Sequence, residues 1–97
     1  MSETVTARFE VLGVERVRQA GRLLALANVT LDMGGVELVL QGVRVFRCMD
    51  GSIAVSGPQW RHPGSGRWTP GVLLPPDLAK AMGGEIIAAY VNEWGTA

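Results

Sequence analysis

The fold prediction starts from one stretch, Gly21-Arg22-Leu23-Leu24-Ala25-Leu26-Ala27-Asn28-Val29-Thr30-Leu31-Asp32, whose residues alternate in character. One set of alternate positions is small or apolar: Leu23, Ala25, Ala27, Val29 and Leu31. The other set contains Arg22, Leu24, Leu26, Asn28, Thr30 and Asp32. Because successive side chains of a strand point to opposite faces, the pattern predicts a strand over residues 22–32 with one face buried. Leu24 and Leu26 place further apolar surface on the second face.

The segments around this strand predict an antiparallel meander over residues 7–57. Residues 7–18 alternate and then change phase near Gly13, which indicates a strand with a β-bulge. Residues 36–48 form the next predicted strand, with a bend or bulge at Gly42. The predicted turns are Gln19-Ala20-Gly21, Met33-Gly34-Gly35 and Asp50-Gly51. The last of these is a strong hairpin signal, and Ile53 and Val55 open the returning strand.

Residues 56–70 differ in character, because three prolines and three glycines separate two Trp and two Arg residues. Trp60-Arg61 stands before Pro63-Gly64-Ser65-Gly66, and Arg67-Trp68 stands after it, so the order is close to a mirror image. If these four central residues form the loop, a short hairpin arm places His62 opposite Arg67 and Arg61 opposite Trp68.

The C-terminal part predicts a helix over about residues 76–94. Pro75-Pro76 suits the first turn, and Gly95 suits the position after the last turn. Helical spacing relates the apolar residues Leu78, Met82, Ile86, Ile87, Tyr90, Val91 and Trp94. The residues expected to dock on the sheet or on a partner are Leu78, Met82, Ile87 and Val91. Gly83-Gly84 indicates a kink or a close approach.

With 97 residues the chain is predicted to be a single α+β domain over residues 1–97. It combines a meander of four to five strands over about 7–57, a hairpin arm over 58–70 and a C-terminal helix.

Composition restricts the classes of function. Nine basic residues balance nine acidic ones, so a strongly basic coat for nucleic acid and an acidic tail are both excluded. The single cysteine, Cys48, cannot form an internal disulfide, and it cannot build a usual metal site with the single histidine, His62. The sequence shows neither a signal peptide nor a membrane-spanning stretch, so a cytoplasmic protein without a membrane partner is expected. No cofactor, metal or small-molecule substrate is indicated.

The stretch from Gly21 to Asp32 resembles the second strand of the stage V sporulation protein G family, the bacterial septation regulators. The likeness continues through Val43-Arg44-Val45, Asp50-Gly51, Ile53-Ala54-Val55, Pro58-x-x-Arg61-x-Pro63 and a closing helix with Tyr90. It spans roughly residues 9–91, and the order and spacing of the pieces carry it. The resemblance implies a small cytoplasmic α+β protein that forms dimers and acts as a DNA- or RNA-binding regulator. The chain departs from the family pattern at Gln59 and Trp60, and its helix has one Lys against three acids.

The arm is the only basic stretch of the sequence that contains no acid, since residues 58–70 hold two Arg and His62. Aromatic faces with Arg between them suit single strands, because bases stack on the rings and phosphates pair with guanidinium groups. The candidate nucleic-acid-binding residues are Arg61, Arg67, Trp60, Trp68, His62, Arg16, Arg18 and Arg22. In the alternative interpretation, the two Trp side chains pack on the sheet or on a partner subunit and the Arg groups are only solvated.

Other classes of function rest on different features. Catalysis is not expected, because the one imidazole lies beside Arg67, and Gly64-Ser65-Gly66 lacks the continuation of a phosphate-binding loop. A protein-interaction module or a structural homodimer without nucleic-acid binding is the alternative, since neutral charge and exposed Trp residues suit a protein partner. One helix cannot cover both faces of the sheet, so Leu24 and Leu26 predict a homodimer that hides the second face. The sequence leaves DNA and RNA both open.

Overall fold

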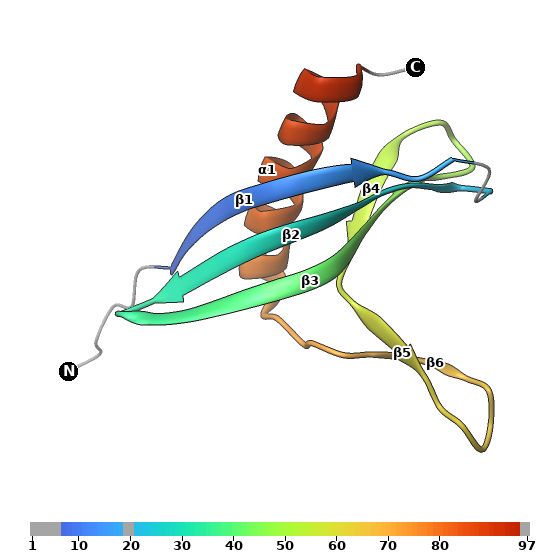
Figure 1. The fold of residues 1–97 in the computed structure, drawn as a ribbon, viewed down its shortest axis with the longest axis horizontal. Coiled ribbons are helices and arrows are strands. Elements are labelled where there is room, and N and C mark those ends of the chain that lie inside the picture. Colours follow the sequence, from blue (N-terminus) through green and yellow to red (C-terminus); the bar gives the residue numbers. More distant parts are fainter. Residues whose placement is uncertain (1–6, 19–20, 96–97) are drawn as a thin grey trace.

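A four-stranded antiparallel sheet, one helix and a small hairpin form the chain in the computed structural model, which describes residues 7–18 and 21–95 (Figure 1). The elements are β1 (Ala7–Arg16), β2 (Leu23–Met33), β3 (Val36–Arg47), β4 (Ile53–Ser56), β5 (Gln59–Arg61), β6 (Trp68–Pro70) and α1 (Pro76–Trp94). The large sheet has the order β1-β2-β3-β4, and β5 pairs with β6 in a separate small sheet. The predicted α+β class and the meander are therefore confirmed.

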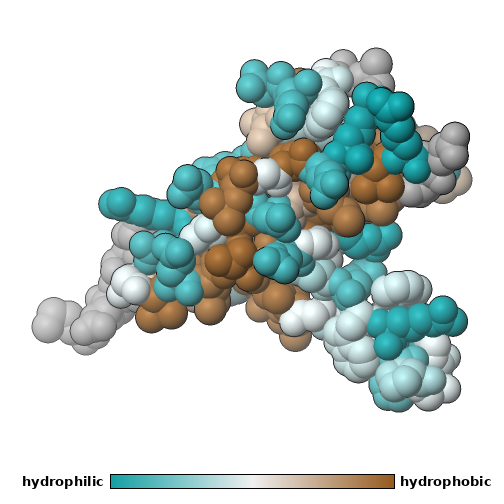
Figure 2. Space-filling view, in the orientation of Figure 1, coloured by the Kyte–Doolittle hydropathy of each residue, from teal (hydrophilic) through white to brown (hydrophobic). Residues whose placement is uncertain are grey.

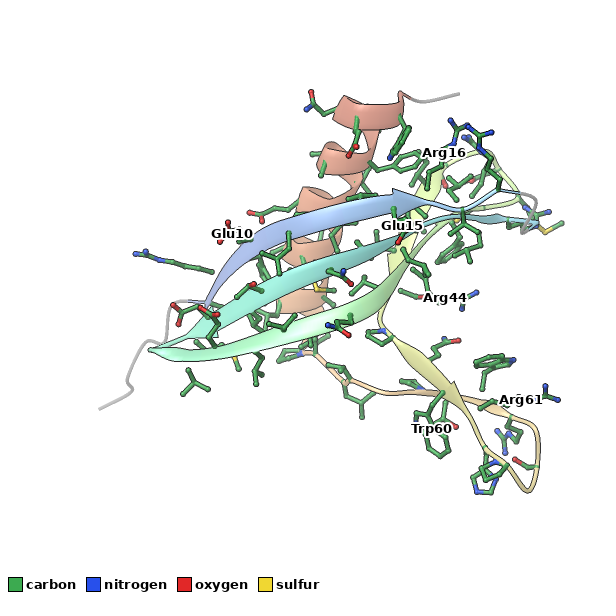
Figure 3. The ribbon with its side chains drawn as sticks, in the orientation of Figure 1. Glu10, Glu15, Arg16, Arg44, Trp60 and Arg61 are labelled. Carbon is green, nitrogen blue, oxygen red and sulfur yellow. The ribbon has the colours of Figure 1, made fainter. Side chains whose placement is uncertain are left out.

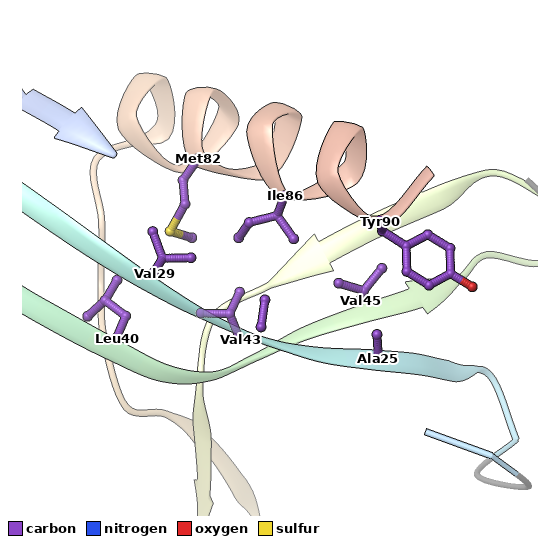
Figure 4. Close-up of a cluster of buried hydrophobic side chains, with 9 residues drawn as sticks. Ala25, Val29, Leu40, Val43, Val45, Met82, Ile86 and Tyr90 are labelled. Atoms are coloured by element: carbon purple, nitrogen blue, oxygen red, sulfur yellow. The ribbon is translucent and has the colours of Figure 1, made fainter. Parts of the chain in front are cut away.

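Helix α1 lies across one face of the large sheet, and the core forms between the two (Figure 4). Met82, Ile86 and Tyr90 of the helix are almost completely buried. The buried sheet residues opposite them are Ala25, Ala27, Val29, Leu40, Val43 and Val45. Figure 4 shows the Tyr90 ring above Ala25. Because alanine is small, the bulky ring fits between helix and sheet without separating them.

Two predicted irregularities of the strands are confirmed. The register of β1 shifts between Val11 and Gly13, which leaves Leu12 as the extra residue of a bulge. The register of β3 shifts opposite Asn28, and Gly42 there has a φ of +76°. Since this φ lies in the left-handed region, which glycine adopts with little cost, the bulge depends on the residue that the sequence supplies.

A third bulge corrects the predicted faces of β2. Leu23 pairs with Phe46, and Ala25 pairs with the residue just before Phe46, so Leu24 is the extra residue. Leu24 packs against the core, whereas Leu23 lines the opposite face beside Leu26. The prediction that Leu23 joins the buried row and Leu24 faces away is therefore wrong, because an unpaired residue reverses the alternation that follows it.

Carboxylates stabilise two of the turns. The Asp32 Oδ1 accepts the Gly35 N–H at 3.0 Å. The Asp50 Oδ1 accepts the hydroxyl of Ser52 at 2.6 Å and its backbone N–H at 2.9 Å, which supports the hairpin predicted there. The hydroxyl and then the N–H of Ser52 hold the pKa of the Asp50 carboxyl below its ordinary value. The first predicted turn includes residues 19–20, which lie outside the described residues.

Helix α1 begins and ends where the sequence predicts. Pro76 is its first residue, and after its end Gly95, with a φ of +78°, donates its N–H to the Val91 carbonyl at 2.8 Å. Gly83 is buried where α1 faces β4. A Cβ there would lie 3.7 Å from the Val55 Cβ, an ordinary van der Waals contact, so the packing of α1 on β4 does not require glycine at this position.

The buried face of the helix differs by one residue from the prediction. Ile86 is completely buried, whereas Ile87, the predicted docking residue, is only half-buried. Met82, Ile86 and Tyr90 repeat every four residues, so they share the helix face that contacts the sheet. The other half-buried members of the stripe are Leu78 and Val91.

The second face of the large sheet, called the open face below, is not covered by α1, which lies behind the sheet in Figure 1. Register places on it Arg8, Glu10, Gly13 and Glu15 of β1, Leu23, Leu26, Asn28, Thr30 and Asp32 of β2, and Glu37, Val39, Arg44 and Phe46 of β3. Figure 2 shows apolar side chains among polar ones along this face. Leu26 is 37% exposed and Val39 is 51% exposed, so the expectation that one helix leaves a second apolar surface uncovered is confirmed.

Candidate nucleic-acid interface

The hairpin of β5 and β6, here called the arm (residues 58–70), projects away from the large sheet (Figure 1). Arg61 pairs with Trp68, and the His62 N–H donates to the Arg67 carbonyl at 2.8 Å. Both pairings agree with the register predicted from the mirror-like sequence, and that prediction is confirmed.

The His62 side chain stabilises the turn at the tip of the arm. Its Nδ1 accepts the N–H of Gly64 at 3.0 Å and the N–H of Ser65 at 3.2 Å. The neutral imidazole therefore carries its proton on Nε2. Gly66 donates its N–H to the His62 carbonyl at 2.8 Å and has a φ of +72°, a conformation that favours glycine. His62 thus has a structural role in the arm, and Nε2 is the ring nitrogen that can still face a ligand.

Each face of the arm presents one Trp ring to solvent. Trp60 and His62 lie on one face, with ring centroids 5.8 Å apart and planes inclined by 39°. Register places Arg67 on this face as well, and it places Arg61 on the other face with Trp68. Trp60 is 46% exposed and Trp68 is 65% exposed. An aromatic surface and a guanidinium group therefore occur together on both sides of the arm.

The base of the arm is held against the large sheet. Arg44 Nη1 donates to the Gln59 Oε1 at 3.0 Å, which joins β3 to β5. The Gly71 N–H donates to the Pro58 carbonyl at 2.7 Å and closes the base of the hairpin. A hollow between the arm and the open face is lined by Leu23, Leu26, Gly42, Arg44, Gln59 and Trp68. Figure 3 shows Arg44 on the side of β3 that faces the arm.

Arg44 is a site residue that sequence reasoning missed. Regular alternation puts Arg44 and Arg47 on opposite faces of β3. The structure agrees, because Arg44 lies opposite Ser56 and Arg47 lies opposite Ile53 with no bulge between them, and residues three positions apart in a regular strand point to opposite faces. Arg44 becomes part of the site through its contact with Gln59, which depends on the direction in which the arm leaves the sheet. No local sequence pattern predicts that direction.

Arg16, Arg18 and Arg22 lie at one end of the large sheet and not on the arm. The Arg16 guanidinium carbon lies 5.5 Å from the centroid of the Trp94 ring, in a cation–π contact. Arg16 and Arg18 line a hollow at the β1 edge together with Trp94. Arg22 Nη1 donates to the Arg47 carbonyl at 3.5 Å. Figure 3 places Arg16 beside the C-terminal end of α1, so these residues are not brought together with the tip of the arm.

Charge is segregated along the large sheet although the chain is neutral. The basic end comprises residues 13–18, 21–27 and 43–56, and the acidic end comprises residues 7–11, 29–33 and 36–40. The basic end contains five Arg and two acidic residues, and the acidic end contains one Arg and three acidic residues. The arm, which adjoins the basic end, adds two Arg and no acid. One end of the large sheet and the arm therefore hold an excess of basic residues, although the chain is neutral.

Similarity to other proteins does not assign the site, because no protein-family model, curated protein or solved structure matches this chain. Within residues 7–18 and 21–95, no group of three or more His, Cys, Asp and Glu side chains is arranged to hold a metal ion. No helix in this described part is long and apolar enough to cross a membrane. The geometry and charge of the arm are therefore the observations on which a functional proposal must rest.

Proposed function

We propose that this protein is a small cytoplasmic regulatory protein that binds single-stranded DNA or RNA through the arm. The observation that carries the proposal is the arm itself, an acid-free hairpin with an exposed Trp and an Arg on each face. The resemblance to the stage V sporulation protein G family supports the same function, and membership in that family stays a prediction. A role in sporulation or septation belongs to the same prediction.

The chemistry of the arm favours single strands over duplexes. The faces of Trp60 and Trp68 are available for stacking, but bases within a duplex already stack on each other and do not offer their faces. Phosphates would pair with Arg61 and Arg67, whose charge is not opposed by any acid of the arm. The other arginines of the basic end add long-range attraction, which raises the rate of encounter with a polyanion.

Fluorescence anisotropy with labelled random oligonucleotides tests the proposal. At low salt the parent protein should bind single strands more tightly than a duplex of the same length. Trp60→Ala should weaken single-strand binding about five- to 150-fold, since a stacked base contributes about 1–3 kcal/mol. Trp94→Ala is the matched control, because this Trp lies on α1 and its ring is already in contact with Arg16. Absence of binding at low salt, or equal losses for both variants, would contradict the proposal.

A protein-interaction module or a structural homodimer without nucleic-acid binding is the second candidate function. The exposed apolar residues of the open face favour it, since contiguous surfaces of this kind usually mark interfaces. This candidate would be supported over the first if the protein binds no oligonucleotide and, used as bait in a pull-down, recovers a specific protein partner.

A further inference from the structure

The hollow between the arm and the open face has the size and the lining of a ligand site. Its volume is about 510 Å³, within the range of about 300–1,000 Å³ that sites for small ligands occupy. Leu23 and Leu26 of β2 form an apolar part of its lining, and Trp68 of β6 contributes a largely exposed ring. An indole ring together with apolar side chains suits a flat aromatic ligand, because such a ligand can stack on the ring and bury its faces.

The polar side chains of this hollow offer hydrogen-bond donors. Arg44 Nη1 donates to the Gln59 Oε1 at 3.0 Å. Since a guanidinium group has donors only, this bond takes the amide oxygen of Gln59 and leaves its NH₂ group for another acceptor. Arg44 keeps further N–H groups beyond the one that makes this bond. Within the described part of the chain, no acidic side chain lines the hollow. The hollow therefore presents amide and guanidinium donors to whatever it holds.

These donors are positioned before any ligand arrives. Arg44 pairs with Leu26 on one side and with Ser56 on the other, so its backbone is fixed within the large sheet. Gln59 pairs with Pro70 in the arm, and its side chain is held by Arg44 (Figure 3). Because the two side chains already hold each other, a ligand would lose little affinity to the ordering of loose side chains.

Donors beside an aromatic surface select a base with two adjacent acceptors. Guanine offers O6 and N7 on one edge, and Arg bound to this pair is the commonest specific contact to a DNA base. Adenine has N7 beside its N6 amino group, which would place donor against donor. Thymine and uracil separate their acceptors by an N–H donor. Cytosine has adjacent acceptors on its Watson–Crick edge, but its single ring buries less surface than a purine does. Guanine therefore fits the lining best.

We propose that the hollow binds a guanine base, stacked on Trp68, whose O6 and N7 accept hydrogen bonds from Arg44 and Gln59. The same chemistry recognises guanine within a single strand and in a free guanine nucleotide. For a strand, the inference rests on the proposed function and adds a base preference to it. Arg61 lies on the same face of the arm as Trp68, where it can pair with a neighbouring phosphate of that strand.

Labelled oligothymidine strands that differ in one central base test this preference by fluorescence anisotropy. A central guanine should give binding about fivefold or more tighter than a central adenine or cytosine, since a good bidentate contact discriminates between bases by at least this factor. A central 7-deazaguanine, in which a C–H group replaces N7, should lose much of this advantage. Calorimetric titration with GMP, AMP and CMP is the second arm, and it identifies a free guanine nucleotide as a ligand if GMP binds tightest.

Gln59→Glu tests the hydrogen bonds with little change in shape. The carboxylate still accepts from Arg44, so the base of the arm stays held, but the amide donors are replaced by an acceptor. This variant should bind strands with a central guanine and a central adenine about equally. Gln41→Glu is the matched control, because it makes the same change at an exposed residue of β3 that does not line the hollow. It should keep the preference for guanine.

The two arms separate the failure of this inference from the failure of the proposed function. Equal affinity for all strands, without a preference for GMP, would overturn the inference and leave single-strand binding standing. Tight GMP binding without strand binding would overturn the proposed function and support the inference. The inference would also be overturned if 7-deazaguanine bound like guanine, if Gln59→Glu kept the preference, or if Gln41→Glu lost it to the same extent.

Discussion

Replacing Ile86 by Ala tests whether the helix–sheet contact is the core of this domain. Ile86 is completely buried, and the substitution removes three carbon atoms from the space between α1 and the sheet. At about 0.8 kcal/mol for each buried carbon, the transfer free energy alone amounts to about 2.4 kcal/mol. The remaining cavity raises the expected loss of unfolding free energy to about 2–5 kcal/mol. For a domain of this size, that loss lowers Tm by at least about 8 °C.

Ile87→Ala is the matched control, because it changes the same residue type at the next position of the same helix. Ile87 is half-buried, so its replacement should cost less than about 2 kcal/mol. Both substitutions alter helix propensity equally, and the difference between the two melting curves therefore measures burial. Urea titrations of both variants, followed by circular dichroism, provide the free energies. Equal losses for the two variants, or a Tm of Ile86→Ala within about 2 °C of the parent, would refute the reasoning.

Three further predictions concern the turns and bulges. Gly42→Ala should lower the unfolding free energy by about 1–2 kcal/mol in a denaturant titration, because the φ of Gly42 is +76°. Gly13→Ala is the control and should not lower it. Neither added Cβ would meet another atom within 4 Å, and of these two glycines only Gly42 has a positive φ. Because the pKa of Asp50 is lowered in the folded protein, its carboxylate stabilises the fold above an unfolded-state pKa of about 3.9, and this stabilisation is lost as the pH falls through the folded-state pKa. Asp50→Asn should therefore flatten the acid limb of a curve of Tm against pH. An unchanged acid limb would contradict this prediction. His62→Ala removes the acceptor at the tip of the arm, so the tip amides should exchange with solvent faster by NMR while the melting of the large sheet stays as in the parent; unchanged exchange would show that the imidazole does not hold the turn.

Most of the fold follows from local sequence patterns, because strands and turns here depend on neighbouring residues. The Asp50 hairpin, the bulge at Gly42 and the limits of α1 are each specified by residues at the feature itself. The two errors have a shared cause. Leu24 and Ile86 each sit next to an equally apolar neighbour, so hydrophobicity alone cannot decide which of the two side chains faces the core.

The candidate site was predictable only within the arm. Its register follows from the mirror-like order of residues 60–68, and both strands of the hairpin lie within that stretch. The contribution of Arg44 was not predictable, because its contact with Gln59 joins residues that are 15 positions apart and lie in different sheets. The segregation of charge likewise depends on which ends of the strands lie together, a property of the meander and not of any single segment.

The salt dependence of single-strand binding tests most directly the claim that the arm is a nucleic-acid site. The measurement compares the parent protein with the double variant Arg61→Ala with Arg67→Ala over a series of salt concentrations. If both guanidinium groups contact phosphates, the slope of log K against log salt concentration should decrease in magnitude by about 1.4, with weaker binding to every sequence. Circular dichroism should show an unchanged fold, because both side chains are exposed. The same affinity and the same slope for both proteins would contradict the account.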